Sequence, residues 1–335
     1  MKETIPGRQL LSDERIFWQN RCYKDHVCVH CDLTLSGFSV MIEGEELIAE
    51  IDADANMQFG VICDGKELPR VVTKTRGLQT VYFAKDISLF ARHRIDVYRL
   101  TEQSEGTLSI HSLTARRFLP RPEEKPELIT FYGDSLTCAY GNEGDPKEEY
   151  RRETQNPLKG YAYLLCKARN ADHEVFGYSG ISVSEKVFVT NFTLGDICFY
   201  NSCHMQYSYL YPRKSDIVVI NIGTNDASAI NRGVGTKQGL ENGLYNFTCK
   251  VIEKHPGAKI VLTSGLSDTH PEQGAITDAA FARLQRRFPD VMLRFVFPRN
   301  VAGANGHPSV EGHINAANAL ISFLAEKVPV KGSKI

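Results

Sequence analysis

The segment LPRPEEKPE, from Leu119 to Glu127, constrains the fold more than any other stretch of the sequence. Its prolines cannot donate backbone hydrogen bonds to a sheet, and the charged residues between them favour solvent. We therefore expect a linker over residues 120–127, with one domain at residues 1–119 and a second at residues 128–335.

The first domain is rich in short segments that alternate apolar and polar side chains, such as LIAEIDADA and TVYFAKDI. Turn-forming pairs, including Asp64-Gly65 and Glu105-Gly106, separate these segments. Repeated short strands with turns between them predict an all-β sandwich of the jelly-roll type.

The second domain has a different hydrophobic pattern, in which continuous apolar segments alternate with amphipathic helical ones. LITFYG, SDIVVINIG and KIVLTSGL are typical of strands buried on both faces, whereas GYAYLLCKARNA and SVEGHINAANALISFLAEKV predict helices. This alternation predicts a three-layered α/β fold with a parallel sheet. In such sheets the reactive groups lie just beyond the carboxyl ends of the strands.

Composition excludes several classes of function. The chain has 335 residues, 42% of them hydrophobic, and a formal net charge of −1 that would not attract nucleic acid or an anionic membrane. No apolar run approaches the roughly 20 residues of a membrane helix. The beginning, MKETIPGRQLL, lacks the apolar core of a secretory signal, so we expect a cytoplasmic protein, although a processed secreted form would look the same. The sequence leaves the oligomeric state open.

The 9 cysteines are scattered along the chain, which is typical of buried thiols in a reducing compartment. Cys28 and Cys31 have the spacing of a zinc-ligand pair, but no second pair follows at the spacing of a zinc finger. We therefore expect neither a metal nor an organic cofactor.

The second domain contains four polar motifs, each of which lies beside a predicted strand or helix. They contain Ser135 after LITFYG, Gly180 at the end of EVFGYSG, Asn225 in INIGTND and His307 before the last helix. We expect them to meet at one edge of the sheet, with Ser135 on a strand-to-helix turn. A serine hydroxyl, an imidazole base and the N–H groups of Ser135, Gly180 and Asn225 would then support attack on an ester carbonyl and stabilise the oxyanion.

Each motif also has a plain structural interpretation. Gly-Asp-Ser is a common turn, Asn225 and Asp226 could cap a helix, and His307 could be an ordinary surface residue. His313, in the first turns of the last predicted helix, is a rival base. We favour His307 because a loop reaches the edge of the sheet more easily than the flank of a helix.

Taken together, the motifs GDSL, YSGIS, GTND and GHPS resemble those of the GDSL or SGNH hydrolases, whose α/β domain is flavodoxin-like. The longer run GDSLTCAYGNEGD, with an N-terminal β-sandwich, is similar to the second family of carbohydrate esterases. This resemblance implies a serine esterase that removes O-acetyl groups from acetylated saccharides such as xylan. Lipases and thioesterases share the SGNH fold, so other acyl esters stay open as substrates. A carbohydrate-binding protein without catalysis is a further alternative.

The sequence departs from that resemblance at Asn305, where the family often has an acid before the catalytic histidine. An amide cannot supply the charge that stabilises an imidazolium. We therefore expect a Ser135–His307 dyad in which Asn305 or a backbone carbonyl orients the imidazole ring.

Aromatic residues near the site would stack on a sugar ring. The family often uses tryptophan, but Trp18 is the only tryptophan of the chain and lies in the first domain. We therefore expect tyrosines to line the substrate site, with Tyr140, Tyr207 and Tyr209 as candidates, and plain packing as the alternative.

Overall fold

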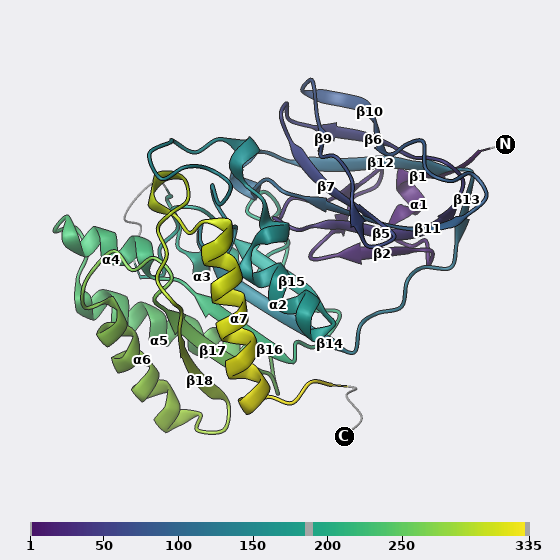
Figure 1. The fold of residues 1–335 in the computed structure, drawn as a ribbon. Coiled ribbons are helices and arrows are strands. Elements are labelled where there is room, and N and C mark those ends of the chain that lie inside the picture. Colours follow the sequence, from purple (N-terminus) through teal and green to yellow (C-terminus); the bar gives the residue numbers. More distant parts are fainter. Residues whose placement is uncertain (1, 185–189, 332–335) are drawn as a thin grey trace. The chain divides into compact units, whose positions relative to one another are not determined.

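The computed structural model describes residues 2–184 and 190–331, and the chain divides into two compact units (Figure 1). The first contains Met1–Glu124 and Asn201–Met205, and the second contains Lys125–Tyr200 and Gln206–Ile335. This division differs from the prediction in two ways. Strand β14 already begins at Glu127, inside the predicted linker of residues 120–127. Residues 201–205 belong to the first unit although their neighbours in the chain belong to the second.

Two antiparallel sheets form the first unit, so the predicted all-β sandwich is confirmed. The first sheet has the order β10-β6-β12-β4-β3, with β1 on β12, and contains β1 (Glu3–Pro6), β3 (Tyr23–Lys24), β4 (Val29–His30), β6 (Leu47–Ala53), β10 (Gly77–Ala84) and β12 (Leu108–Ala115). The second has the order β13-β5-β11-β7-β8, with β2 on β5 and β9 on β7, and contains β2 (Ile16–Gln19), β5 (Gly37–Glu43), β7 (Gln58–Cys63), β8 (Lys66–Glu67), β9 (Val71–Val72), β11 (Arg92–Arg99) and β13 (Arg117–Leu119). Short helical segments are α1 (Gly7–Leu10) and η1 (Gln103–Glu105).

Aromatic side chains join the two sheets of this unit. Phe83 of β10 meets Phe38 of β5 edge-on, with ring centroids 5.7 Å apart, and Phe59 of β7 in the same manner at 5.3 Å. All three rings are buried in the hydrophobic core. Edge-to-face packing of this kind stabilises a core beyond the area that it buries.

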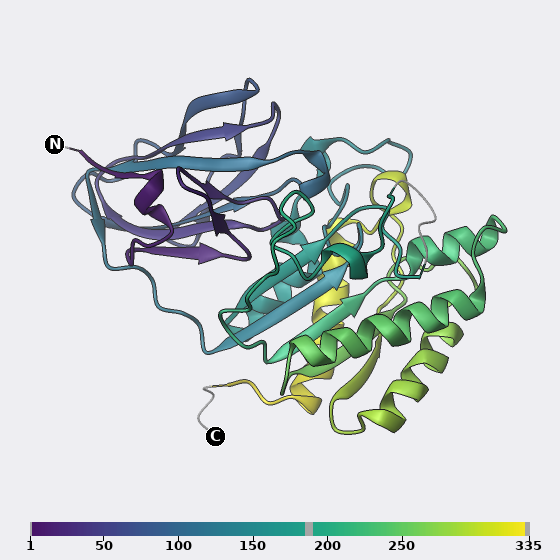
Figure 2. The same cartoon turned by 180° about the vertical axis from the view of Figure 1, so that it is seen from behind.

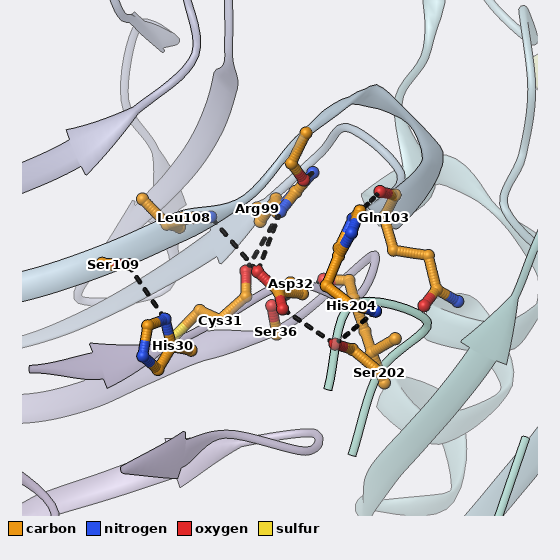
Figure 3. Close-up of polar contacts among 12 residues, drawn as sticks. His30, Cys31, Asp32, Ser36, Arg99, Gln103, Leu108, Ser109, Ser202 and His204 are labelled. Atoms are coloured by element: carbon orange, nitrogen blue, oxygen red, sulfur yellow. Dashed lines mark hydrogen bonds and ion pairs between the residues drawn. The ribbon is translucent and has the colours of Figure 1, made fainter. Parts of the chain in front are cut away.

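A buried acid attaches residues 201–205 to this unit (Figure 3). Asp32 is fully buried, and its Oδ2 accepts hydrogen bonds from the hydroxyls of Tyr23 at 2.5 Å and Ser202 at 2.8 Å. Its Oδ1 lies 4.0 Å from Nη1 of Arg99, which is also fully buried. A buried carboxylate needs such partners, because an unpaired one would be expensive to desolvate.

The second unit contains one parallel sheet with the order β15-β14-β16-β17-β18, the 2-1-3-4-5 order of a flavodoxin-like fold. Its strands are β14 (Glu127–Gly133), β15 (Ala171–Gly177), β16 (Ile217–Asn221), β17 (Lys259–Ser264) and β18 (Met292–Val296). Its helices are α2 (Tyr161–Arg169), α3 (Leu194–Ile197), α4 (Thr224–Asn231), α5 (Lys237–Lys254), α6 (Gln273–Arg287) and α7 (Val310–Lys327), with short turns η2 (Arg152–Thr154), η3 (Pro157–Lys159) and η4 (Ala304–Gly306). The predicted three-layered α/β fold is confirmed.

Helices cover both faces of this sheet. Helices α2 and α7 pack together on one face (Figure 1), and α5 and α6 lie together on the other (Figure 2). Every residue of β14, β15 and β16 is buried, as expected for strands covered on both faces. The chain runs from β14 to β15 on one side and then to β16 on the other, so a topological switch point lies beyond the carboxyl ends of β14 and β16.

Candidate active site

Ser135 lies two residues after Gly133, the last residue of β14, beside the switch point. The backbone is crowded there: a Cβ on Gly133 would lie 2.1 Å from the Thr137 hydroxyl oxygen and 2.5 Å from the Asn221 carbonyl oxygen. Only glycine therefore allows the chain to turn at this place without displacing β16. The Gly-Asp-Ser sequence is thus explained by close approach of two backbone segments.

Asp134 shapes the turn that carries the serine. Its Oδ1 accepts a hydrogen bond from the backbone N–H of Leu136 at 3.0 Å. The predicted strand-to-helix turn is wrong in one respect, because residues 135–143 form consecutive turns and no helix begins at Ser135. Ala139 and Gly141 both have a φ of +58°, and this left-handed conformation cannot continue a right-handed helix.

The Ser135 hydroxyl and the His307 imidazole form a hydrogen bond. Ser135 Oγ lies 2.9 Å from His307 Nε2, although the two residues are 172 positions apart in the sequence. The arrangement places a base within reach of the hydroxyl proton, which is the geometric requirement for activating a serine.

No acid among the described residues bonds to the other nitrogen of the imidazole ring. His307 Nδ1 is buried and makes no hydrogen bond with any described residue, and the Asn305 side chain is exposed without a hydrogen bond among those residues. Burial lowers the pKa of His307, while the backbone carbonyls of Asn305 and Ala304 oppose this shift. Neither of the two predicted orienting groups, the Asn305 amide or a backbone carbonyl, makes a hydrogen bond to Nδ1 within the described chain.

Gly180 and Asn225 follow the two strands that flank β14. Gly180 comes after β15 and has a φ of +78°, in the left-handed region that favours glycine. Asn225 lies in the first turn of α4, after β16, and its Nδ2 donates to the Ile181 carbonyl at 2.8 Å. This bond joins the two loops and fixes the side-chain amide, whose second N–H makes no hydrogen bond to the residues that the structure describes.

Asp226 is a positioning residue that the sequence did not reveal. Its buried carboxylate accepts hydrogen bonds from the Val183 N–H at 3.0 Å and the Ser184 N–H at 2.9 Å, and from the Ser184 hydroxyl. Burial raises its pKa, although these hydrogen bonds favour the carboxylate. The plain alternative, in which Asp226 caps α4, is not seen, because Gly223 occupies the N-cap. Asp226 instead holds the loop that contains Gly180.

One of the predicted tyrosines packs on His307 of the Ser135–His307 pair. The Tyr140 ring packs on His307 with centroids 4.4 Å apart, and Tyr150, which the sequence did not reveal, stacks on Tyr140 at 4.0 Å. Tyr209 lies elsewhere, because its hydroxyl donates to Glu174 in the middle of β15. Tyr207 is 73% exposed, and within the described part of the chain its ring does not pack on His307.

His313, the rival base, is a core residue. It is fully buried in α7, accepts a hydrogen bond from the Tyr161 N–H at 3.3 Å through Nδ1, and stacks on the Tyr161 ring. Burial and the nearby His307 lower the pKa of His313 to about 3. Ser309 caps α7, as its position predicts, through a hydrogen bond from the Gly312 N–H at 3.2 Å.

Within the described ranges, the groupings of Cys, His and Asp whose atoms could surround a metal ion lie in the first unit, away in sequence from Ser135. No helix of the described chain combines the length and the apolar character that crossing a bilayer requires.

Sequence comparison identifies related esterases. A cellulase/esterase of Acetivibrio thermocellus is 26% identical over 317 residues, which cover 89% of this chain and 38% of that protein. An acetylxylan esterase/glucomannan deacetylase of Cellvibrio japonicus is 27% identical over 240 residues, which cover 68% of this chain and 64% of that protein. The chain thus spans less than two thirds of the length of either relative.

Solved structures share the fold over nearly the whole chain. A family two carbohydrate esterase from Clostridium thermocellum, in complex with cellohexaose, has a TM-score of 0.87 at 23% identity and covers 93% of this chain and 99% of its own. An acetyl xylan esterase from the rumen bacterium Butyrivibrio proteoclasticus has a TM-score of 0.88 at 17% identity and covers 99% and 100%. The model of the GDSL-like lipase/acylhydrolase family matches residues 131–327, more than half of the sequence and all of the four motifs. The chain therefore belongs to the GDSL-like lipase/acylhydrolase family.

Proposed function

We propose that this protein is a serine esterase that removes O-acetyl groups from carbohydrates. The observation that carries the proposal is the hydrogen bond of 2.9 Å between Ser135 Oγ and His307 Nε2, beyond the carboxyl end of β14. The position of Ser135 just beyond the carboxyl end of β14 supports the proposal, because ligands of such folds bind at the switch point there. The related acetylxylan esterases support an acetylated saccharide as the substrate.

The reaction begins when Ser135 Oγ attacks the carbonyl carbon of the acetyl ester and His307 Nε2 takes the hydroxyl proton. The tetrahedral oxyanion accepts hydrogen bonds from the Ser135 and Gly180 N–H groups and from the Asn225 amide. His307 then gives its proton to the leaving sugar oxygen. A water molecule, deprotonated by the same imidazole, releases acetate and restores the serine.

The dyad works without an acid behind His307. An acid at Nδ1 stabilises the imidazolium that forms during the reaction, but the donors of the oxyanion hole and the positioning of the substrate act independently of it. The backbone carbonyls of Asn305 and Ala304 oppose the lowering of the His307 pKa by burial, and this effect favours the imidazolium.

A panel of esters tests the proposal. Singly acetylated xylosides, glucosides and mannosides, together with the matching butyrate and octanoate esters, are incubated with the protein, and release of the free acid is followed. We expect acetate to be released from sugars faster than longer acids from the same alcohols. A preference for long acyl chains would instead indicate a lipase or thioesterase.

A carbohydrate-binding protein without catalysis is the second candidate. His307 has no acidic partner among the described residues, and a carbohydrate esterase of similar structure has an active site that displays divergent catalytic and non-catalytic binding functions. That structure has a TM-score of 0.77 at 21% identity, which shows the fold alone. Oligosaccharide binding without hydrolysis of any ester in the panel would favour this candidate and contradict the first.

A further inference from the structure

A turn in the first unit brings together a thiol, an imidazole and a carboxylate. The turn joins β3 (Tyr23–Lys24) to β4 (Val29–His30), which pair as an antiparallel hairpin. Cys28 Sγ lies 3.5 Å from Asp25 Oδ2 and 3.6 Å from His30 Nε2, and His30 Nε2 lies 3.1 Å from Asp25 Oδ2. These residues have no part in the proposed esterase reaction.

The separations match those of ligand atoms around one zinc ion. Zinc bonds of about 2.0–2.3 Å in tetrahedral geometry place the ligand atoms roughly 3.3–3.6 Å from one another. The three distances of 3.1, 3.5 and 3.6 Å lie at or close to this range. A thiolate, an imidazole and a carboxylate together are ligands that suit Zn²⁺ better than Ca²⁺ or Mg²⁺.

Neighbouring groups hold the imidazole ring of His30 in the orientation that a metal ligand needs. His30 Nδ1 lies 2.9 Å from Ser109 Oγ of β12, the strand that pairs with β4 (Figure 3). Without a metal, His30 Nε2 and Asp25 Oδ2 form a hydrogen bond at 3.1 Å. Once Nδ1–H donates to the Ser109 hydroxyl, the lone pair of Nε2 is free to bind a metal on the side of Cys28 and Asp25. The Tyr23 ring stacks on the imidazole with centroids 4.8 Å apart. Metal-binding histidines commonly have a partner of this kind on the second nitrogen.

The carboxylate of Asp25 is likewise fixed by the turn. Its Oδ1 accepts hydrogen bonds from the N–H groups of Val27 at 2.7 Å and Cys28 at 2.9 Å. This arrangement leaves Oδ2 for the metal. Cys28 is buried, whereas Asp25 is exposed, so the cluster opens to solvent on the side of the carboxylate.

We propose that Asp25, Cys28 and His30 form a zinc site in the first unit, with water as the fourth ligand. Binding replaces the Cys28 S–H bond by a Zn–S bond and releases that proton to solvent. The site pins the β3–β4 hairpin to its own sheet through Ser109. No metal is expected from the sequence, and Cys31, which has zinc-ligand spacing to Cys28, is not among these ligands, because Cys31 Sγ faces Cys22 Sγ at 3.2 Å.

A second grouping of the same three residue types is an internal control. His93 Nδ1 lies 2.7 Å from Asp64 Oδ2, which is the distance of a direct hydrogen bond, and 3.9 Å from Cys63 Sγ. The other nitrogen of His93 bonds to the Ser88 carbonyl at 2.8 Å. The His93–Asp64 separation is too short for two ligands of one zinc ion, which need roughly 3.3 Å, so this grouping is a direct hydrogen bond rather than a metal site.

Titration with Co²⁺ in place of Zn²⁺ tests the site, because a cobalt–thiolate bond gives a charge-transfer absorption band in the near ultraviolet. The 335-residue chain is kept reduced, and Zn²⁺ is added afterwards to displace the cobalt. We expect one equivalent of Co²⁺ to produce the band and one equivalent of Zn²⁺ to remove it. Absence of the band in the wild-type protein would contradict the proposal.

Four variants locate the metal. Cys28→Ser should abolish the band, and Asp25→Asn, which keeps the Oδ1 acceptor of the turn, should weaken Co²⁺ binding more than tenfold. Ser109→Ala should weaken binding by about 10- to 100-fold through loss of the His30 partner. Cys63→Ser should bind Co²⁺ as the wild type does. Unchanged binding in both Cys28→Ser and Asp25→Asn, or loss of binding in Cys63→Ser, would overturn the assignment.

Discussion

Two serine–histidine pairs in the second unit have the same separation but different surroundings. Ser135 Oγ lies 2.9 Å from His307 Nε2, and Ser215 Oγ lies 2.9 Å from His255 Nδ1. Ser135 follows the carboxyl end of β14, whereas Ser215 comes shortly before β16, at its amino end. Only the first pair therefore lies at the edge of the sheet where ligands bind.

Both members of the Ser215–His255 pair make further hydrogen bonds to buried residues. Ser215 Oγ also contacts the Thr130 hydroxyl at 2.6 Å, and His255 Nε2 contacts the Tyr132 hydroxyl at 2.8 Å. Ser215, His255, Thr130 and Tyr132 are all buried. Such a satisfied network stabilises a fold, because each polar group has replaced its water by a protein partner.

The comparison teaches that a short Ser–His distance does not by itself define an active site. The Ser135 pair differs in having a partly exposed imidazole, an Nδ1 without a hydrogen bond among the described residues, and neighbouring loops that carry Gly180 and Asn225. Reactivity requires a hydroxyl that a substrate can reach and donors for the charge that develops.

The largest expected effect separates the two serines directly. Ser135→Ala should lower kcat for acetyl ester hydrolysis by about 10⁴- to 10⁶-fold, because the nucleophile is removed. The matched variant Ser215→Ala should keep the rate but lower the free energy of unfolding by about 1–3 kcal/mol, because Thr130 and His255 lose a buried partner. Steady-state kinetics measures kcat, and denaturant unfolding measures the free energy of unfolding of each variant. Equal activity of the two variants would remove the distinction between the pairs.

The oxyanion donors give the next largest effect. Asn225→Ala should lower kcat by about 10²- to 10³-fold with little change in KM, since the amide acts mainly on the charge of the transition state. Asn231→Ala is the matched control, because Asn231 lies in the same helix and its amide donates to the Thr269 carbonyl at 2.7 Å. Comparable losses in both variants would indicate damage to α4 rather than loss of a donor.

The pH dependence of the rate tests the role of His307 as the base. His307 must be neutral to accept the serine proton, and burial lowers its pKa below the ordinary value of 6.5. We expect kcat/KM to stay constant on lowering the pH to that value and to fall by about tenfold per pH unit only below the pKa of His307. A profile of kcat/KM against pH, recorded with an unactivated acetyl ester, measures the pH at which the rate falls to half. If kcat/KM fell to half its plateau value at a pH above 6.5, a group other than His307 would control the rate.

The smallest effect concerns the ring that packs on the base. Tyr140→Leu removes the aromatic contact with His307, whose centroids are 4.4 Å apart, and should lower kcat/KM by about three- to tenfold. Tyr140→Phe keeps the ring and should restore the rate. If both variants lose activity equally, the hydroxyl of Tyr140 rather than its ring is what matters.

Much of this arrangement could be predicted from the sequence, because strand ends are marked locally. Apolar strands stop at Gly133 and near Gly180 and Asn225, and the parallel fold then brings these ends to one edge. The connection of residues 201–205 to Asp32 could not be predicted in this way, since the two segments are far apart in the sequence.

The missed residues share a physical cause. Asp226 acts on Val183 and Ser184, and Tyr150 acts through Tyr140, so neither has a local pattern that reveals its partner. Tyr209 was misplaced for the same reason: only the tertiary fold shows that its hydroxyl reaches Glu174. Contacts between separated loops depend on packing, which periodicity does not encode.

Labelling with a fluorophosphonate, followed by peptide mass spectrometry, tests the central distinction most directly. The reagent forms a covalent bond only with a serine that a neighbouring base activates and an oxyanion hole assists. We expect one adduct per chain, on Ser135, and none on Ser215. An intact chain that stays unlabelled at Ser135, or carries the adduct on Ser215, would contradict the assignment of the active pair.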